Sequence, residues 1–255
     1  VNMMEKQQFH SILKKIYFTV KGTFMKKKLT SFLVCLLILI AFGGFVFFIG
    51  WTQFKIEPNN VGILISKTSG INNKPIYPGT FSWHWEFLIP TNAQLKMFTQ
   101  EPYIISKKVK GTLSNGEIYQ ASYNKNLDFS YDLDFSITIK VLPENILKLL
   151  KENIITDQAS LSNYINNAVA IATQKITSYC LTTSENDISF RPEAISPQEL
   201  IKISNISEQY PELTFDSILI MNSKLPDYNL YIKARNLYIK NFDSYTESIE
   251  NTKTE

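Results

Sequence analysis

The residues best suited to acid–base chemistry are the two histidines, His10 and His84. A hydrolytic Ser-His-Asp or Cys-His site would depend on His84, because a long apolar run separates His10 from the rest of the chain. His84 stands in the stretch Phe-Ser-Trp-His-Trp-Glu-Phe, and no recognisable nucleophile motif lies beside it. We therefore interpret His84 as a hydrogen-bonded or interfacial residue and not as a catalytic base.

Other kinds of chemistry find little support in the sequence. Two histidines and two cysteines are too few for a zinc site, and the nine glycines form no phosphate-binding loop. Asp128, Asp132 and Asp134 are closely spaced, but a calcium loop needs more oxygen ligands and a turn, so we interpret them as part of a solvated sheet face. Serine and lysine are abundant, and nothing singles out a Ser-Lys pair. We expect no catalytic, metal-binding or cofactor-binding residues, and hence a protein that is not an enzyme.

Charge and cysteine content narrow the class of partner. The net charge of +3 is small, so no strong basic patch argues for nucleic acid. Cys35 lies inside the apolar run and Cys180 far beyond it, so we expect no intrachain disulfide. These features leave membranes and other proteins as the expected partners.

The strongest structural signal is the uncharged run of residues 29–54, which follows Met25-Lys26-Lys27-Lys28. With a rise of about 1.5 Å per residue, a helix of this length crosses a hydrocarbon core of about 30 Å. Lysines are concentrated before the run, whereas Lys55 beyond it is balanced by Glu57. The positive-inside rule then places the N-terminus in the cytoplasm and the main domain on the periplasmic side of a bacterial inner membrane.

Two alternatives remain open in this region. A cleaved signal peptide has a shorter apolar core and a small-x-small cleavage site, and Phe48-Ile49-Gly50-Trp51 is a poor one, so we favour a retained anchor. Before the run, residues 9–18 could form a basic amphipathic helix on the cytoplasmic leaflet. Equally, Met25 could be the true start, because Met-Lys-Lys-Lys before an apolar run is an ordinary bacterial beginning.

Beyond the run, residues 55–141 have the pattern of β-structure. Residues 61–65 form a short apolar strand after a Pro-Asn-Asn turn, and residues 81–87 alternate so that four aromatic side chains fall on one face of a predicted strand. This face could belong to the core or rest in the interfacial zone of the membrane, where the nearby anchor would hold it. The membrane-interface hypothesis comprises Trp51, Phe81, Trp83, Trp85 and Phe87.

Residues 109–255 are predicted to form strands followed by helices, with one further strand before the last helix. Asn115-Gly116 predicts a hairpin turn between residues 109–113 and 118–123. Alternation over residues 131–141 predicts a long antiparallel strand with one buried face. Capping signals and apolar residues at helical spacing predict further elements: a helix from Pro143, a helix over 161–180, a helix from Ser196 toward Tyr210, a strand over 213–221 and a last helix after Pro226. The polar residues 247–255 are expected to fray.

This order resembles the stomatin/prohibitin/flotillin family, also called the SPFH or Band 7 family, and especially its bacterial members that modulate a membrane protease. The resemblance covers about residues 50–245. It rests on four segments: residues 57–65 directly after the apolar run, the Pro78-Gly79 turn with its following aromatic residues, the strand 131–141 running into residues 143–147, and residues 213–226 before the last helix. The last helix is short and rich in tyrosine, where family members continue into a long coiled coil rich in Ala and Glu. Residues 181–197 match no family motif.

The resemblance implies an α+β protein in four parts: a basic cytoplasmic segment (1–28), a transmembrane helix (29–54), an SPFH-like domain with an antiparallel β part followed by an α/β part (55–225), and a terminal helix with a polar tail (226–255). It implies a non-enzymatic scaffold that associates laterally on membrane lipids with like protomers, of the same or another chain. Such a scaffold organises or modulates membrane proteins, with a membrane protease as one candidate. The alternative is an adaptor subunit of a larger cell-envelope complex.

Overall fold

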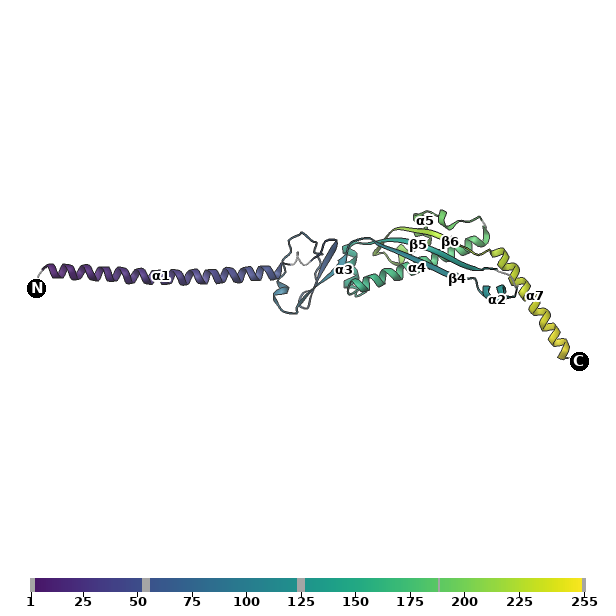
Figure 1. Ribbon diagram of the computed structural model, residues 1–255, viewed down its shortest axis with the longest axis horizontal. Coiled ribbons are helices and arrows are strands. Elements are labelled where there is room, and N and C mark those ends of the chain that lie inside the picture. Colours follow the sequence, from purple (N-terminus) through teal and green to yellow (C-terminus); the bar gives the residue numbers. More distant parts are fainter. Residues whose placement is uncertain (1–2, 52–55, 123–126, 188, 254–255) are drawn as a thin grey trace.

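A computed structural model describes residues 3–51, 56–122, 127–187 and 189–253. The molecule is elongated, with a long helix (α1) at one end, a small sheet next to it, a larger body of sheet and helices, and a projecting helix (α7) at the other end (Figure 1). The architecture is mixed α+β, as the sequence predicts, and the described strands form two antiparallel sheets, the second of which includes the last strand.

Helix α1 covers Met3–Gly50 without a break. Its part Thr30–Gly50 has a mean hydropathy of 3.0 and is long enough to cross a membrane, and none of this window is buried inside the protein. The segment before it continues along the same axis (Figure 1), so residues 9–18 are helical but do not form a separate element. The helix ends at Gly50, and residues 52–55 of the predicted span lie outside the described part of the chain.

The first sheet has the strand order β2-β1-β3, with β1 at Asn60–Ser66, β2 at Gly70–Ile71 and β3 at Ala93–Thr99. The predicted strand over residues 61–65 is therefore confirmed. Strand β1 is buried on both faces, since Val61 and Ile63 join the main core while Leu64 packs in a small cluster with Ile56 and Ile76. This arrangement joins the small sheet to the larger body through apolar contacts.

The second sheet has the strand order β4-β5-β6, with β4 at Tyr103–Thr112, β5 at Ser130–Val141 and β6 at Leu213–Lys224. The central strand β5 confirms the predicted alternation, because Leu133, Phe135, Ile137, Ile139 and Val141 are all buried. Its other face carries Asp132 and Asp134, and Lys108 of β4 lies 3.3 and 3.0 Å from their carboxylates. These aspartates therefore belong to a solvated sheet face, as expected.

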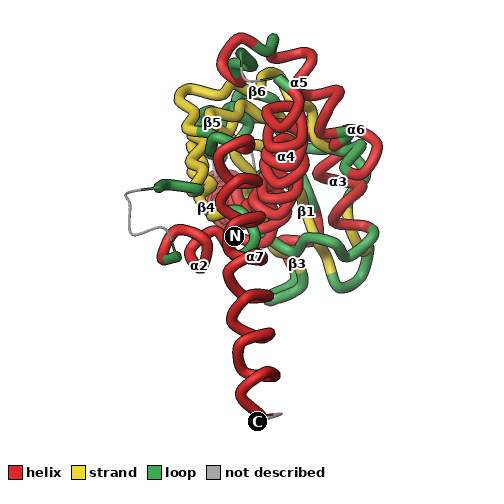
Figure 2. The backbone as a smooth tube through the Cα atoms, turned by 90° about the vertical axis from the view of Figure 1, so that its right-hand side faces the viewer, coloured by secondary structure: helices red, strands yellow, loops and turns green. Residues whose placement is uncertain are grey.

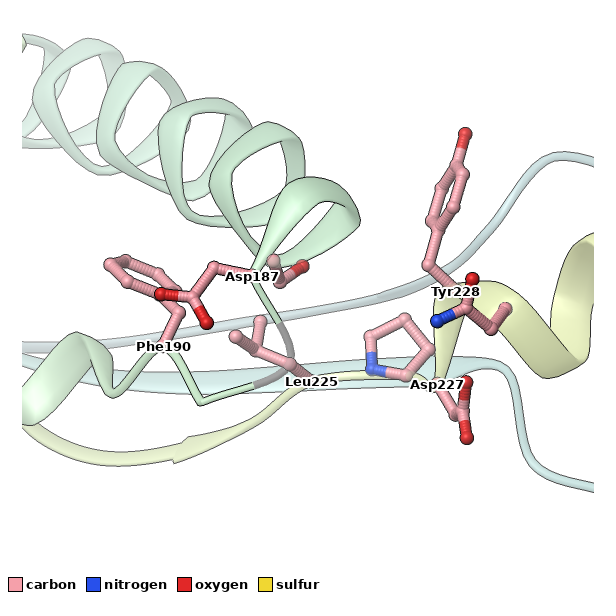
Figure 3. A pocket seen from close by; sticks show the side chains of 8 residues that line it. Asp187, Phe190, Leu225, Asp227 and Tyr228 are labelled. Carbon is pink, nitrogen blue, oxygen red and sulfur yellow. The ribbon is translucent and has the colours of Figure 1, made fainter.

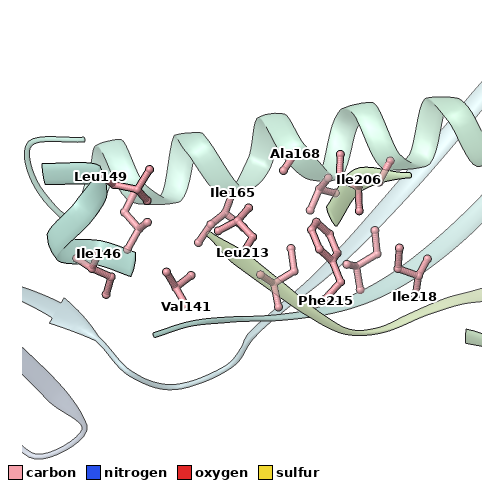
Figure 4. Close-up of a cluster of buried hydrophobic side chains, with 14 of the residues drawn as sticks. Val141, Ile146, Leu149, Ile165, Ala168, Ile206, Leu213, Phe215 and Ile218 are labelled. Carbon is pink, nitrogen blue, oxygen red and sulfur yellow. The ribbon is translucent and has the colours of Figure 1, made fainter. Parts of the chain in front are cut away.

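The helices of the body are α3 (Pro143–Lys151), α4 (Gln158–Asn186), α5 (Pro197–Ser204) and α6 (Ile206–Gln209). Helix α4 lies along the buried face of the second sheet (Figures 2 and 4). A capping box starts it: Asp157 accepts a hydrogen bond from the Ser160 N–H at 2.8 Å, and the Ser160 hydroxyl accepts one from the Asp157 N–H at 2.9 Å. The Ser196 cap of α5, predicted from the sequence, accepts from the Glu199 N–H at 3.3 Å.

The main core lies between α4 and the second sheet (Figure 4). Each fully buried Leu or Ile side chain stabilises such a core by about 1.5–3 kcal/mol relative to exposure. Cys180 lies at the C-terminal end of the apolar face of α4, and burial raises the pKa of its thiol to about 12. The apolar face of α4 consists of Leu161, Ile165, Ala168, Val169, Ala172, Ile176 and Cys180.

A half-buried ion pair ties α3 and α4 to Glu212, the residue before β6. Glu212 accepts from the Lys148 ammonium at 2.7 Å and from the Tyr164 hydroxyl at 3.1 Å, and its carbonyl accepts from the Asn145 side chain at 2.8 Å. The Lys148 hydrogen bond holds the pKa of Glu212 below its ordinary value even though burial acts in the opposite direction. The carboxylate is therefore satisfied where it is buried.

Two predicted strands are wrong. The segment after Asn115 forms a short helix, α2 (Gly116–Ala121), because Tyr119 packs inward and the strand partner of β4 is β5. Residues 81–87 form no strand either: an isolated β-bridge at Trp83 is followed by a 3-10 turn over Trp85–Leu88. The first prediction rested on the Asn115-Gly116 turn signal and the second on alternation over residues 81–87, but neither segment pairs with a strand among the described residues.

Helix α7 covers Tyr228–Lys253, and the Asp227 carboxylate accepts from the Leu230 N–H at 2.9 Å at its start. The sequence predicts fraying over residues 247–255, but the helix continues to Lys253; residues 254 and 255 lie outside the described chain. The final strand and the following helix are thus in the predicted order.

Candidate membrane-proximal site

The end of α1 and the loop of residues 81–88 form one contact region at the boundary between the apolar helix and the first sheet. We call the residues Phe47, Trp51, Phe81, Trp83 and Trp85 the aromatic collar. The rings of Phe47 and Phe81 are stacked with centroids 5.9 Å apart, and Trp51 lies 5.5 Å from Phe47 and 6.0 Å from Phe81. The collar therefore joins two segments that are about thirty residues apart in sequence.

Hydrogen bonds hold the loop against the last turn of α1. The Trp83 indole donates to the Phe47 carbonyl at 3.2 Å, and the His84 main-chain N–H donates to the Gly50 carbonyl at 2.8 Å. The Phe47 carbonyl also accepts from the Trp51 main-chain N–H at 3.1 Å, so the Trp83 indole is a second donor to it. The last carbonyls of a helix have no partner within the helix, so the His84 N–H satisfies a Gly50 carbonyl that would otherwise need water or another cap. The orientation of the loop is thereby fixed to the helix axis.

Gly50 allows this close approach. A Cβ atom at this position would lie 2.2 Å from the Trp83 Nε1, far inside van der Waals contact. Gly43 and Gly44, in the middle of the apolar helix, have no atom within 4 Å of an added Cβ. Of these three helix glycines, Gly50 is thus the one that contacts the collar.

The collar is largely open to its surroundings. Phe81 is 62% exposed, Trp85 46% and Trp83 37%, and Leu88 and Ile89 extend this apolar surface. Phe87 behaves differently, because it packs against the small cluster under the first sheet. The structure thus brings four of the five residues of the membrane-interface hypothesis together at the end of the apolar helix and places the fifth, Phe87, in a core. Contact with lipid remains a prediction for these residues.

A polar strip runs through the same loop. The Ser82 hydroxyl and the His84 Nε2 are 2.7 Å apart, and the His84 Nδ1 lies 3.8 Å from the Glu86 carboxylate. The Glu86 side chain is buried, and its main-chain carbonyl accepts from the Asn92 side chain at 3.3 Å. The His84 main-chain N–H and the Trp83 indole, the donors beside this strip, point at carbonyls of α1. His84 is therefore a hydrogen-bonded residue, one of the two interpretations that the sequence left open.

The opposite end of the molecule has a second aromatic cluster, where α7 leaves the body. Tyr231 packs 5.6 Å from Tyr119 and 5.5 Å from Phe129, and its hydroxyl donates to the Ser114 carbonyl at 2.6 Å. Tyr238 lies 5.5 Å from the Tyr119 ring. This contact was not predicted, because residues 118–123, which include most of α2, have the turn signal of a hairpin strand before them.

The aromatic stripe of α7 continues beyond the body. Phe242 is 59% exposed and Tyr245 is 65% exposed, and Ile249 follows on the same face at heptad spacing. A cavity of about 210 Å³ lies at the joint between the end of α4 and the start of α7 (Figure 3). Asp187 and Asp227 line it together with Phe190 and Leu225. Hydrogen bonds from Ser189 hold the pKa of Asp187 below its ordinary value, so this carboxylate is ionised at neutral pH.

Within the described residues, no group of three or more His, Cys, Asp or Glu side chains could hold a metal ion. No protein-family model matches the chain. The chain is similar to an uncharacterized protein of Treponema pallidum (strain Nichols), with 23% identity over 211 residues that cover 80% of this chain and 71% of the relative. This similarity extends over most of both proteins, at an identity too low to show the family.

Proposed function

We propose that the protein is a membrane-anchored, non-enzymatic scaffold of the SPFH type that assembles laterally on a bilayer and organises or modulates membrane proteins. A membrane protease is one candidate for the protein that it modulates. We further propose that α1 is retained as a single span of a bacterial inner membrane, with the N-terminus in the cytoplasm and the main domain on the periplasmic side.

One observation carries this proposal: the last turn of the apolar helix contacts the domain through the aromatic collar. The bonds from Trp83 and His84 to the last turn of α1 fix the direction in which the domain leaves the bilayer. Because every copy would stand in the same orientation, weak lateral contacts between neighbours are enough for assembly at the high local concentration that an anchor creates.

The order of elements supports the resemblance to the SPFH family. Strand β1 follows α1 closely, the Pro78-Gly79 turn has Gly79 at φ +79°, and β5 runs into α3. Strand β6 leads through Pro226 into α7, at the end farthest from α1 (Figure 1). The exposed residues Phe242 and Tyr245 form an apolar face on α7 to which a neighbouring helix can bind.

Native electrophoresis and cryo-electron microscopy of detergent-extracted protein test lateral assembly. A large homomeric or SPFH-like heteromeric ring or arc is expected. A complex with one or a few copies and unrelated subunits would replace the scaffold with the alternative, an adaptor of a larger envelope complex. The bulky exposed residues Phe242 and Tyr245 on α7 favour that alternative over a closely packed coiled-coil wall.

Protease digestion tests the orientation. A protease added to the periplasmic face of intact inner membranes is expected to cut in the body beyond residue 56 and to leave α1 protected. Full protection of the body would reverse the proposed topology, and release of a soluble chain lacking α1 from untreated cells would favour a cleaved signal sequence.

A further inference from the structure

Strand β4 has one free edge. It pairs with β5 over its whole length, from Tyr103 opposite Ile139 to Thr112 opposite Ser130. Among the described residues, no other strand or loop forms main-chain hydrogen bonds with Tyr103–Thr112. An edge of this length presents a row of main-chain donors and acceptors to any extended chain that approaches it.

The other edge of the same sheet is covered. The turn at Pro192–Ala194 and helix α5 pack against β6, and the Ser223 hydroxyl donates to the Glu193 carboxylate at 2.6 Å. The two edges of the sheet therefore differ, and β4 is the one that is available for pairing.

The middle of the β4 edge is basic and exposed on both faces. Ser106, Lys107 and Lys108 are consecutive exposed residues. Lys108 and Lys110 lie on the solvated face, within 3.3 Å of the carboxylates of Asp132 or Asp134. These aspartates neutralise the two lysines and hold their side chains over the face of the sheet. The lysine side chains therefore do not cover the β4 edge.

Lys107 is on the opposite face, which carries Ile105 and Val109 against the main core. Its exposure means that the layer of helices does not reach the edge of the sheet at this position. Lys107 has no ion pair among the described residues. An uncompensated ammonium therefore stands beside the free backbone of the edge.

A second copy of this chain is not expected to pair with the β4 edge. The strands of the sheet run roughly along the long axis, as α1 does (Figure 1), so an antiparallel pair of β4 edges would point the two α1 helices in opposite directions. A parallel pair would place each Lys107 beside the same residue of the second copy, and like charges directly opposite are destabilising. The first of these arguments rests on the proposed membrane anchor, and the second does not.

We propose that the β4 edge is a docking site for an acidic extended segment of another protein, which adds to the sheet as a fourth strand. Main-chain hydrogen bonds along the edge supply affinity, and a carboxylate beside Lys107 supplies selectivity. The partner would lie parallel to the long axis of the body, alongside the anchored protein.

Peptide binding to the detergent-solubilised full-length chain tests this proposal. The probe is a fluorescent peptide of alternating Val and Glu as long as β4, compared with a Val-Lys peptide and with a Val-Glu peptide that is N-methylated at alternate main-chain nitrogens. Fluorescence anisotropy is expected to show binding of the Val-Glu peptide, with about tenfold weaker binding of the other two.

Variants of the protein locate the site. Lys107→Glu is expected to weaken binding of the Val-Glu peptide about threefold, which is the size of one exposed ion pair. Lys74→Glu makes the same change of charge in the loop after β2 and is expected to have no effect. Absence of Val-Glu binding, equal binding of the N-methylated peptide, or equal losses in the two variants would overturn the proposal. Native electrophoresis reports on lateral assembly separately, so failure of one proposal is distinguishable from failure of the other.

Discussion

The core side of the second sheet and the loop beside the first sheet differ in the exposure of their aromatic rings. In the second sheet Phe135 is 2% exposed, and the solvated face of β5 carries charges that lysines of β4 neutralise. The first sheet, next to α1, has a small cluster of its own, but the loop between β2 and β3 leaves Phe81 62% exposed. A water-soluble surface rarely gathers large aromatic rings in this way.

Exposed tryptophan and phenylalanine at the end of an apolar helix match the composition of the membrane–water interface. Charged, ion-paired side chains on a sheet face match contact with water or with a polar partner. On the proposed anchoring, the two regions would therefore face different surroundings, with the boundary at the first sheet.

The largest expected difference in the free energy of unfolding is between substitutions of Phe135 and of Phe81. Phe135→Ala removes a ring from a closed core and is expected to lower the free energy of unfolding by about 3–5 kcal/mol. Phe81→Ala removes the same atoms from the collar and is expected to cost less than about 1 kcal/mol in detergent. Thermal unfolding followed by circular dichroism measures both, and equal losses would show that the collar is a true core.

The next effect concerns the contact between α1 and the collar. Gly50→Ala places a methyl group where the Trp83 indole lies, so the indole must move and the bond to the Phe47 carbonyl is lost. We expect destabilisation of the collar by about 1–2 kcal/mol. All three tryptophans of the chain belong to the collar, so tryptophan emission reports on it directly.

Gly44→Ala is the matched control, because a Cβ at this position meets no atom within 4 Å. Its emission spectrum and unfolding curve are expected to equal those of the unmodified protein. An equal change in both variants would show that the effect comes from the helix itself and not from contact with Trp83.

The smallest of these effects is in the body and depends on pH. The folded-state pKa of Glu212 is lowered by Lys148, so the stability that it contributes is present above its unfolded pKa of about 4.3 and is lost as the pH falls through the lower folded value. Glu212→Gln is expected to cost about 1 kcal/mol at pH 7, because Lys148 is half exposed and partly screened.

Thermal unfolding of both proteins between about pH 7 and pH 3 checks this expectation. The difference between the unmodified protein and Glu212→Gln is expected to shrink as the solution becomes acidic. Glu199→Gln, an exposed carboxylate on α5, serves as the control and is expected to show little difference at any pH. A constant difference for Glu212→Gln would contradict the role assigned to its charge.

Much of the fold follows from local signals in the sequence. Strand β5 was predictable because its alternation is long and its inward residues are all aliphatic or aromatic. Helices α3 and α5 were predictable because Pro143 and Ser196 mark their starts. The apolar part of α1 was predictable from length and composition alone.

The errors arise where a contact distant in sequence decides the local conformation. Residues 81–87 alternate like a strand, but hydrogen bonds from Trp83 and His84 to α1 take the place of a strand partner. Asn115 adopts a left-handed conformation with φ +57°, as in a hairpin turn, yet it starts a helix because Tyr119 packs on α7. No signal in the sequence reported either contact.

The most direct test of the account is the depth of the collar in a bilayer. The protein is reconstituted into vesicles whose lipids carry bromine either near the headgroup end or near the end of the acyl chains, and intrinsic tryptophan emission is recorded. Because Trp51, Trp83 and Trp85 are all collar residues, we predict strong quenching by the shallow bromines and weak quenching by the deep ones. Emission unchanged by both lipids would show that the collar lies in water, and would contradict the proposed seating of the domain on the membrane.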